Sequence, residues 1–164
     1  MKGIDIVGDY QFDIADWGTV SFNDTMSIID TWTFKEYAGA PTEDCKGIWG
    51  GACGYPNPDF RNVLRTTWVT PWDVTVALSW RHIPKIDDYN GVTDLDAIDY
   101  FDLAGSWEIT DYASVRLGVN NLFDEEPPFA GFNAGPSNNG NGGTFPGMYD
   151  ALGQYWFIGG EVKF

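Results

Sequence analysis

Apolar and polar residues alternate along several stretches of this chain, which is the period of a β-strand whose two faces differ. The clearest stretch in the middle of the chain is 73–86, where Val74, Val76, Leu78 and Trp80 alternate with Thr75, Ala77, Ser79 and Arg81. The last residues, from Gly153 onward, follow the same rule, with Glu161 and Lys163 opposite the apolar side chains. The alternation favours an all-β, antiparallel fold with one apolar and one polar face.

Stretches of this kind predict about seven up-and-down strands, joined by connections of two different lengths. The strands are expected at 3–14, 19–35, 59–70, 73–86, 98–109, 113–123 and from 153 to the C-terminus. Short connections fall at 15–18, 70–73 and 110–112, and long ones at 36–58, 87–97 and 125–148. Asp24 and Asp30 interrupt the apolar alternation of the second stretch, which predicts a β-bulge or an extension of the strand beyond a membrane.

Two folds share this alternation. A transmembrane β-barrel has strands of about ten residues, short periplasmic turns and longer extracellular loops, and it carries aromatic residues at both membrane interfaces. Five tryptophans lie near expected strand ends, namely Trp17, Trp68, Trp72, Trp80 and Trp107. A soluble β-sandwich would pack its apolar face inward, but it does not require connections of two lengths. The connections and the tryptophans favour the barrel.

In a barrel the polar face lines a watery lumen and the apolar face meets lipid. The charged side chains expected to face the lumen are Arg61, Arg65, Arg81, Asp102, Glu108, Arg116, Glu161 and Lys163.

The charge and the termini exclude several classes of protein. A net charge of -15 with nine Lys and Arg lacks the basic surface that nucleic acid requires. No stretch is as long and apolar as a membrane-spanning helix, and the first ten residues have no apolar segment of a signal peptide. Nothing in the chain pairs a nucleophile with a base, so we expect no enzyme and no cofactor.

Cys45 and Cys53 lie in one Gly- and Pro-rich loop. We expect a disulfide between them, with two free thiols as the alternative. We expect no zinc site, because the pair has no second pair and the single histidine, His82, is distant in sequence. The acidic residues of 87–99 lack the spacing of a calcium-binding loop, so we expect no metal.

The segment VRLGVNNLFDEEPP, followed by YDALGQYWFIGGEVKF, resembles the C-terminal end of TonB-dependent outer-membrane receptors. The matching positions are Asn121, Leu122, Phe123, Asp124, Pro127, Pro128, Tyr149, Asp150, Gly153 and Phe164. Gln154 departs from the pattern, because the family usually has Arg there. The part from the cysteine loop through residue 82 is similar to the large proteobacterial subgroup of these receptors, so the resemblance extends over most of the chain, with residues 1–35 the least distinctive.

The resemblance implies a barrel of about 22 strands that holds a separate plug domain. About seven strands cannot close such a barrel, so residues 1–164 are expected to be its C-terminal part. The plug domain, the segment that contacts TonB and the signal peptide would then lie upstream. The resemblance also implies that the barrel-assembly machinery reads the last strand through Trp156, Ile158, Val162 and Phe164, although Phe164 could equally serve as a lipid anchor.

The resemblance implies a function in the bacterial outer membrane, namely energy-coupled uptake of a scarce solute such as a ferric siderophore, a cobalamin or an oligosaccharide. The long loops are the ligand-side candidates. Their aromatic residues that could stack on a small-molecule ligand, or else pack within the loops, are Trp49, Tyr55, Phe129, Phe132 and Phe145. The alternative is a soluble, secreted, carbohydrate-binding β-sandwich.

Overall fold

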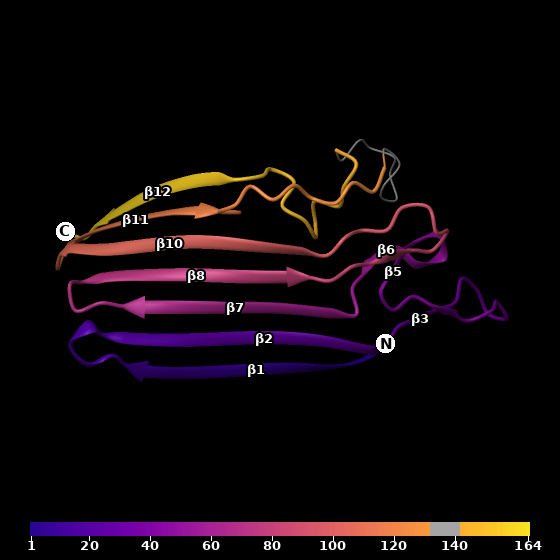
Figure 1. The fold of residues 1–164 in the computed structure, drawn as a ribbon, viewed down its shortest axis with the longest axis horizontal. Helices are drawn as coiled ribbons and strands as arrows, with labels where there is room; N and C mark the ends of the chain where they lie inside the picture. The colour runs from indigo at the N-terminus through magenta and orange to yellow at the C-terminus, as the bar shows by residue number, and fades with distance from the viewer. Residues whose placement is uncertain (132–141) are drawn as a thin grey trace.

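The computed structural model describes residues 1–131 and 142–164, and its main feature is one antiparallel sheet of seven long strands (Figure 1). The strand order in the sheet is β1-β2-β7-β8-β10-β11-β12, so every long strand pairs with the next one along the chain. The strands are β1 Lys2–Asp13, β2 Thr19–Thr31, β7 Phe60–Val69, β8 Val74–Ile83, β10 Ile98–Thr110, β11 Ala113–Asn120 and β12 Tyr155–Val162. The predicted all-β, up-and-down fold class is confirmed; the sheet is open, with β1 and β12 at its edges.

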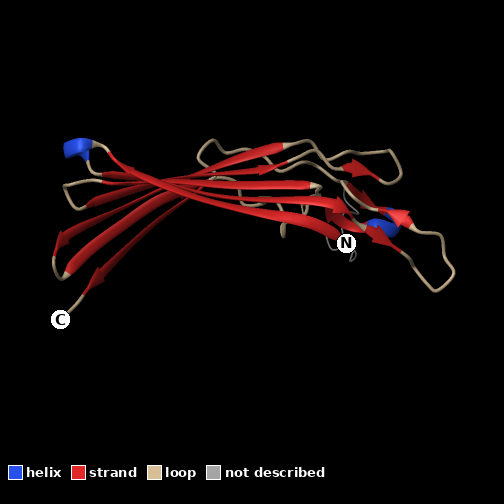
Figure 2. Ribbon diagram, turned by 90° about the horizontal axis from the view of Figure 1, so that it is seen from below, coloured by secondary structure: helices blue, strands red, loops and turns tan. Residues whose placement is uncertain are grey.

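The short and the long connections lie at opposite ends of the sheet. Figure 1 shows the three short turns and the C-terminus at one end, and the long loops and the N-terminus at the other. Viewed from below, the long strands form a single twisted layer (Figure 2), as the right-handed twist of β-strands requires. The segregation predicted from the lengths of the connections is therefore present.

The long loops carry short elements of their own. They form a two-stranded sheet and a three-stranded sheet in which β5 lies between β6 and β9. These elements are β3 Thr33–Phe34, β4 Glu43–Asp44, β5 Ile48–Gly50, η2 Gly51–Cys53, β6 Gly54–Asn57 and β9 Asp87–Asp88, and η1 Ala15–Trp17 forms the first short turn. Across residues 1–131 and 142–164, no helix has the length and apolar character needed to cross a membrane.

The register of the strands sorts the side chains of the large sheet into two sets. Val76 of β8 lies beside Gly105 of β10, Gly105 beside Leu117 of β11, and Leu117 beside Ile158 of β12. Because neighbouring residues across a sheet share a face, these residues belong to one apolar face. The residues between them along each strand form the opposite, polar face.

The apolar face is exposed rather than covered by a second layer. Ile158 is 80% exposed, Leu117 51% and Ile6 49%. The buried hydrophobic cluster lies instead among the long loops and the adjoining strand ends, and consists of Ile83, Ile86, Leu95, Ile98, Tyr100, Ala130, Phe145 and Tyr149. The described part of the chain thus has a core at its loop end, and a bare apolar sheet face along its length.

The second strand has one of the irregularities expected from its sequence. Lys2 pairs with Thr31 and Gly3 with Ile29, so Asp30 is an extra residue and forms a β-bulge. The bulge expected at Asp24 is wrong, because the register on both sides of Asp24 is unbroken. Its carboxylate accepts a hydrogen bond from Asn62 Nδ2 on β7 at 2.7 Å, so the polar side chain is satisfied without leaving the ladder.

Candidate functional site

Seven of the eight charged residues expected to line a lumen share the polar face of the sheet. The register places Arg61 opposite Ser27, Asp102 opposite Ser79, and Glu161 opposite Ser114. Four others, on the same alternation of their strands, are Arg65, Arg81, Glu108 and Arg116. Lys163 follows the end of β12, and its Nζ lies 3.9 Å from Glu161 Oε1. The structure therefore brings together side chains that the sequence scatters over about a hundred residues.

Three carboxylates on β1 extend this polar face to the edge of the sheet. Asp5 Oδ1 accepts a hydrogen bond from Ser27 Oγ at 2.7 Å, and Asp13 Oδ1 accepts one from Thr19 Oγ1 at 2.7 Å. Asp9 accepts one from the Asn23 side chain. These aspartates are not among the residues predicted to face a lumen, although their alternation with apolar residues in 3–14 is a signal that identifies them.

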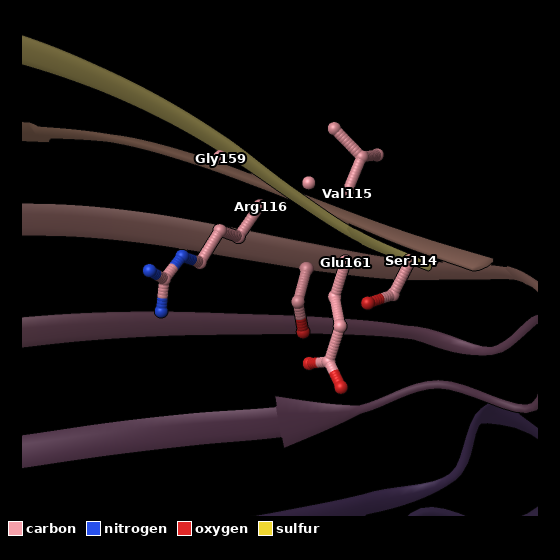
Figure 3. Close-up of a pocket in the computed structure, with 7 residues that line it drawn as sticks. Ser114, Val115, Arg116, Gly159 and Glu161 are labelled. Carbon is pink, nitrogen blue, oxygen red and sulfur yellow. The ribbon is translucent and has the colours of Figure 1, made fainter. Parts of the chain in front are cut away.

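Figure 3 shows the polar face near the short-turn end of β10, β11 and β12, where Ser114, Arg116 and Glu161 extend to one side and Val115 to the other. These side chains and Ser106 border a shallow pocket of about 300 Å³. A Cβ added to Gly159 would lie 2.8 Å from Arg116 Nε, so the absence of a side chain at Gly159 leaves room for the arginine to lie across β12. The polar face is open at this position, and the pocket is not an enclosed cavity.

Arg81 on β8 is the centre of an ion-pair network on the polar face. Its Nε donates to Asp102 Oδ2 at 2.9 Å, and its Nη1 donates to Asp150 Oδ1 at 3.0 Å. The guanidinium Cζ lies 4.9 Å from the centroid of the Tyr100 ring, and Asp102 also accepts a hydrogen bond from the Asn121 N–H at 2.9 Å. The network joins β8 and β10 to the loop that precedes β12.

The first half of the family motif forms a tight turn after β11. Asn121 is fully buried and has a φ of 52°, a left-handed conformation that Asn tolerates. Its Nδ2 donates to the carbonyl of Glu125 at 2.9 Å, and its Oδ1 accepts from the Glu125 N–H at 2.9 Å. Leu122 N donates to the carbonyl of Phe101, and the rings of Phe101 and Phe123 lie 5.4 Å apart.

The second half of the motif contacts the first. Asp124 Oδ1 accepts a hydrogen bond from the Gln154 N–H at 2.7 Å. The Gln154 side chain donates to the carbonyl of Leu122 at 2.8 Å and accepts from Trp156 Nε1 at 3.1 Å. The residue that replaces the expected arginine therefore serves as a neutral link between the turn after β11 and the start of β12.

Tyr149 and Asp150 fasten this loop to the sheet. Asp150 N donates to Tyr100 Oη at 3.2 Å. Tyr149 is 2% exposed, and burial raises the pKa of its hydroxyl to about 12. Together with the Arg81 network, these contacts join the segment before β12 to β8, to β10 and to the turn after β11.

Gly153 is the position in the motif where a side chain is least tolerated. It has a φ of 68°, and an added Cβ would lie 2.8 Å from Asp124 Oδ1. We predict that Gly153→Ala lowers the free energy of unfolding by about 1–2 kcal/mol, because it combines left-handed strain with this close contact. Thermal unfolding in detergent would measure the loss. Gly147→Ala is the matched control, since a Cβ there meets nothing within 4 Å; equal melting temperatures for the two variants would contradict the prediction.

The aromatic residues of the loops differ in their accessibility. Phe145 is 2% exposed and lies between Trp49 and Tyr55, with ring centroids 5.4 Å and 5.9 Å away. Trp49 Nε1 donates to the carbonyl of Thr93 at 3.1 Å. Phe145 and Trp49 therefore pack within the loops, which was the alternative role considered for them. Tyr55 is 58% exposed, and Phe129 is 56% exposed. Phe132 lies outside the described residues.

The disulfide lies within one loop and an acidic turn lies in the next, and a pair of short strands joins the two loops. Cys45 and Cys53 are joined, and β5 next to them pairs with β9 of the following loop. Asp88 in β9 accepts hydrogen bonds from the N–H groups of Asn90, Val92 and Thr93, which lower the pKa of its carboxyl. No group of three or more His, Cys, Asp or Glu in the described ranges is arranged to hold a metal ion.

The residues proposed as an assembly signal lie along the edge strand. Trp156 pairs with Val119 and Ile158 with Leu117, and both belong to the apolar face. Trp156 is 69% exposed and Val162 is 65% exposed. Phe164 follows the end of β12 and is fully exposed. These side chains are accessible from the apolar side.

Comparison with known protein families gives one match. The family model described as TonB dependent receptor-like, beta-barrel, matches residues 1–122. Comparisons with curated proteins and with solved structures give no match. The matched range includes β1 to β11 and ends within the motif after β11, so the family model and the C-terminal resemblance cover complementary parts of the chain. The family consists of outer-membrane receptors that work with TonB. The chain therefore belongs to the TonB-dependent receptors, as part of their β-barrel.

Proposed function

We propose that this chain is the C-terminal part of the barrel wall of a receptor that takes up a scarce solute across the outer membrane. The observation that carries the proposal is the division of the sheet into an exposed apolar face and a charged polar face, with all long loops at one end. A barrel wall needs this division, because lipid covers one face and a watery lumen the other. The alternative, a β-sandwich, requires a second sheet packed on the apolar face. The part of the chain that the structure describes has no such layer.

In the proposed orientation the short turns face the periplasm and the long loops face the outside. The eight charged residues then line the lumen, toward a plug domain supplied by a preceding segment that also reaches TonB. Of the aromatic candidates that the structure describes, Tyr55 and Phe129 are the ones with exposed rings on the ligand side. The solute is a ferric siderophore, a cobalamin or an oligosaccharide. The last strand is the part that the barrel-assembly machinery would recognise, through Trp156, Ile158, Val162 and Phe164.

Labelling of intact cells tests the orientation. A single cysteine is placed at Tyr55 in a long loop or at Trp72 in a short turn, two positions of similar exposure. A maleimide that cannot cross the membrane should label Tyr55→Cys and leave Trp72→Cys unlabelled until the cells are opened. The disulfide of Cys45 and Cys53 does not react with maleimide. Labelling of both positions in intact cells, or release of the protein without detergent, would overturn the proposal.

Uptake assays test the solute. A strain that lacks the receptor is given ferric siderophore, cobalamin or maltooligosaccharide, each carrying a radioactive label. We expect uptake of one of the three to fall to the level of a strain without TonB, and to return when the receptor is restored. Unchanged uptake of all three would exclude the proposed solutes while leaving the orientation intact.

A further inference from the structure

A groove interrupts the apolar face of the sheet around Gly105. Gly105 lies between Val76 and Leu117 in a row of apolar side chains that crosses β8, β10 and β11. The groove has a volume of about 270 Å³, and Leu103, Val119 and Trp156 also line it. An added Cβ at Gly105 would meet only the carbonyl oxygen of Thr75, at 3.7 Å, so the space above the glycine is open. We call this feature the Gly105 groove.

The lining of the Gly105 groove is hydrocarbon. It includes no charged side chain. Among the lining residues Val119 is 2% exposed, whereas Leu117 is 51% and Trp156 69% exposed. A ligand in this groove would find no polar side-chain partner other than the indole N–H of Trp156, and that group already donates to Gln154 Oε1. The groove therefore suits a narrow apolar chain.

The position of Trp156 gives the groove a direction. Trp156 lies at the loop end of β12, and its N–H is held by Gln154, which precedes the strand. A tryptophan with its ring on apolar surface and its N–H bonded beyond it is typical of a membrane–water interface. The polar end of an occupant would thus lie on the Gln154 side, and its apolar part would run toward Gly105.

From these features we infer that the Gly105 groove seats one acyl chain of a lipid from the outward-facing leaflet, with the lipid head group beside Gln154. The inference rests on the proposed function, because the apolar face has to meet the bilayer. The groove is continuous with that face, and it opens above Gly105, where a side chain is missing. Since the surrounding lipid is already apolar, the preference comes from the dispersion contacts of a fitted chain, so we expect an enrichment of about threefold.

Photolabelling in liposomes tests the groove. The receptor is reconstituted with a phospholipid that carries a diazirine in one acyl chain, and the labelled residues are mapped by mass spectrometry. Leu117 in the groove and Ile6 outside it belong to the same face, and their exposed fractions are 51% and 49%. We expect Leu117 to be labelled about threefold more than Ile6. Equal labelling of Leu117 and Ile6 would contradict binding of an acyl chain in the Gly105 groove. It would leave intact the assignment of this face to the membrane.

Two leucine substitutions provide the matched comparison. Gly105→Leu fills the groove, and Gly8→Leu adds the same side chain to the same face where a Cβ meets nothing within 4 Å. Labelling of Leu117 should fall to the level of Ile6 in Gly105→Leu and stay unchanged in Gly8→Leu. If Gly105→Leu does not fold, the ratio of Leu117 labelling to Ile6 labelling in the wild-type protein still tests the proposal. Labelling confined to the polar face would overturn the proposed function itself.

Discussion

Replacing Arg81 by Met is expected to lower the free energy of unfolding by about 2–3 kcal/mol and to release the loop before β12. The side chains of Arg81, Asp102 and Asp150 are 20% to 29% exposed, so water screens the two carboxylates only partly. Without the guanidinium, both carboxylates lose the cation that they share. Thermal unfolding in detergent measures the stability, and limited proteolysis measures how readily the segment 125–148 is cut.

Arg65→Met is the matched control for this prediction. Arg65 lies on the neighbouring strand β7 and on the same polar face, and within the described residues it makes no ion pair. Its replacement should change the free energy of unfolding by no more than about 0.5 kcal/mol and leave the proteolysis pattern as it is. Equal effects of the two substitutions would show that loss of a positive charge, and not loss of the network, weakens the protein.

Removing the disulfide should loosen the loop end while the long strands keep their stability. Cys45 and Cys53 are eight positions apart. In the chain-entropy description, a disulfide that closes a loop of this size stabilises the folded loop by about 2.5 kcal/mol, and its removal loses this amount. Cys45→Ser with Cys53→Ser should therefore raise the population of locally open loop by on the order of 60-fold. We expect faster hydrogen exchange at the N–H groups of Gly47 and Asp87, which bond to Asn57 and Gly47.

The amide groups that pair β8 with β10 provide the internal reference for this measurement, because they lie in the same molecule and outside the loops. Their exchange rates should not change. Reduction of the wild-type protein by dithiothreitol should reproduce the effect of the double substitution. If exchange at Gly47 and Asp87 stays at the wild-type rate in both experiments, the β5–β9 pairing and the hydrophobic cluster hold the loops without the disulfide.

The sequence predicted the parts of the fold that depend on local pattern. Alternation of apolar and polar residues is set by neighbours two positions apart, so it located the seven strands and the face on which Arg61 or Glu161 lies. The bulge was predicted from the same local pattern and is correct at Asp30 but wrong at Asp24. Asp24 stays in the regular ladder because its carboxylate accepts a hydrogen bond from Asn62 on another strand. The pattern along one strand gives no information about such a partner.

The contacts of the site depend on residues that are distant in sequence. Arg81 and Asp150 are 69 positions apart, and the sequence assigned one to the lumen and the other to the family motif without joining them. The sequence left two roles open for Phe145, contact with a ligand or packing within the loops, and Trp49 and Tyr55 from another loop pack against its ring. Such packing is determined by how the loops fold over one another, for which alternation along a strand gives no signal.

The open edges of the sheet set a condition on any bilayer that holds it. Along β1 and β12, the N–H and C=O groups that point away from the sheet have no strand beside them in the described structure. In hydrocarbon each unpaired group costs several kcal/mol, so these two rows of donors and acceptors cannot remain bare there. Insertion therefore has to be coupled to pairing at both borders, and a membrane would receive this wall together with its neighbouring strands rather than on its own.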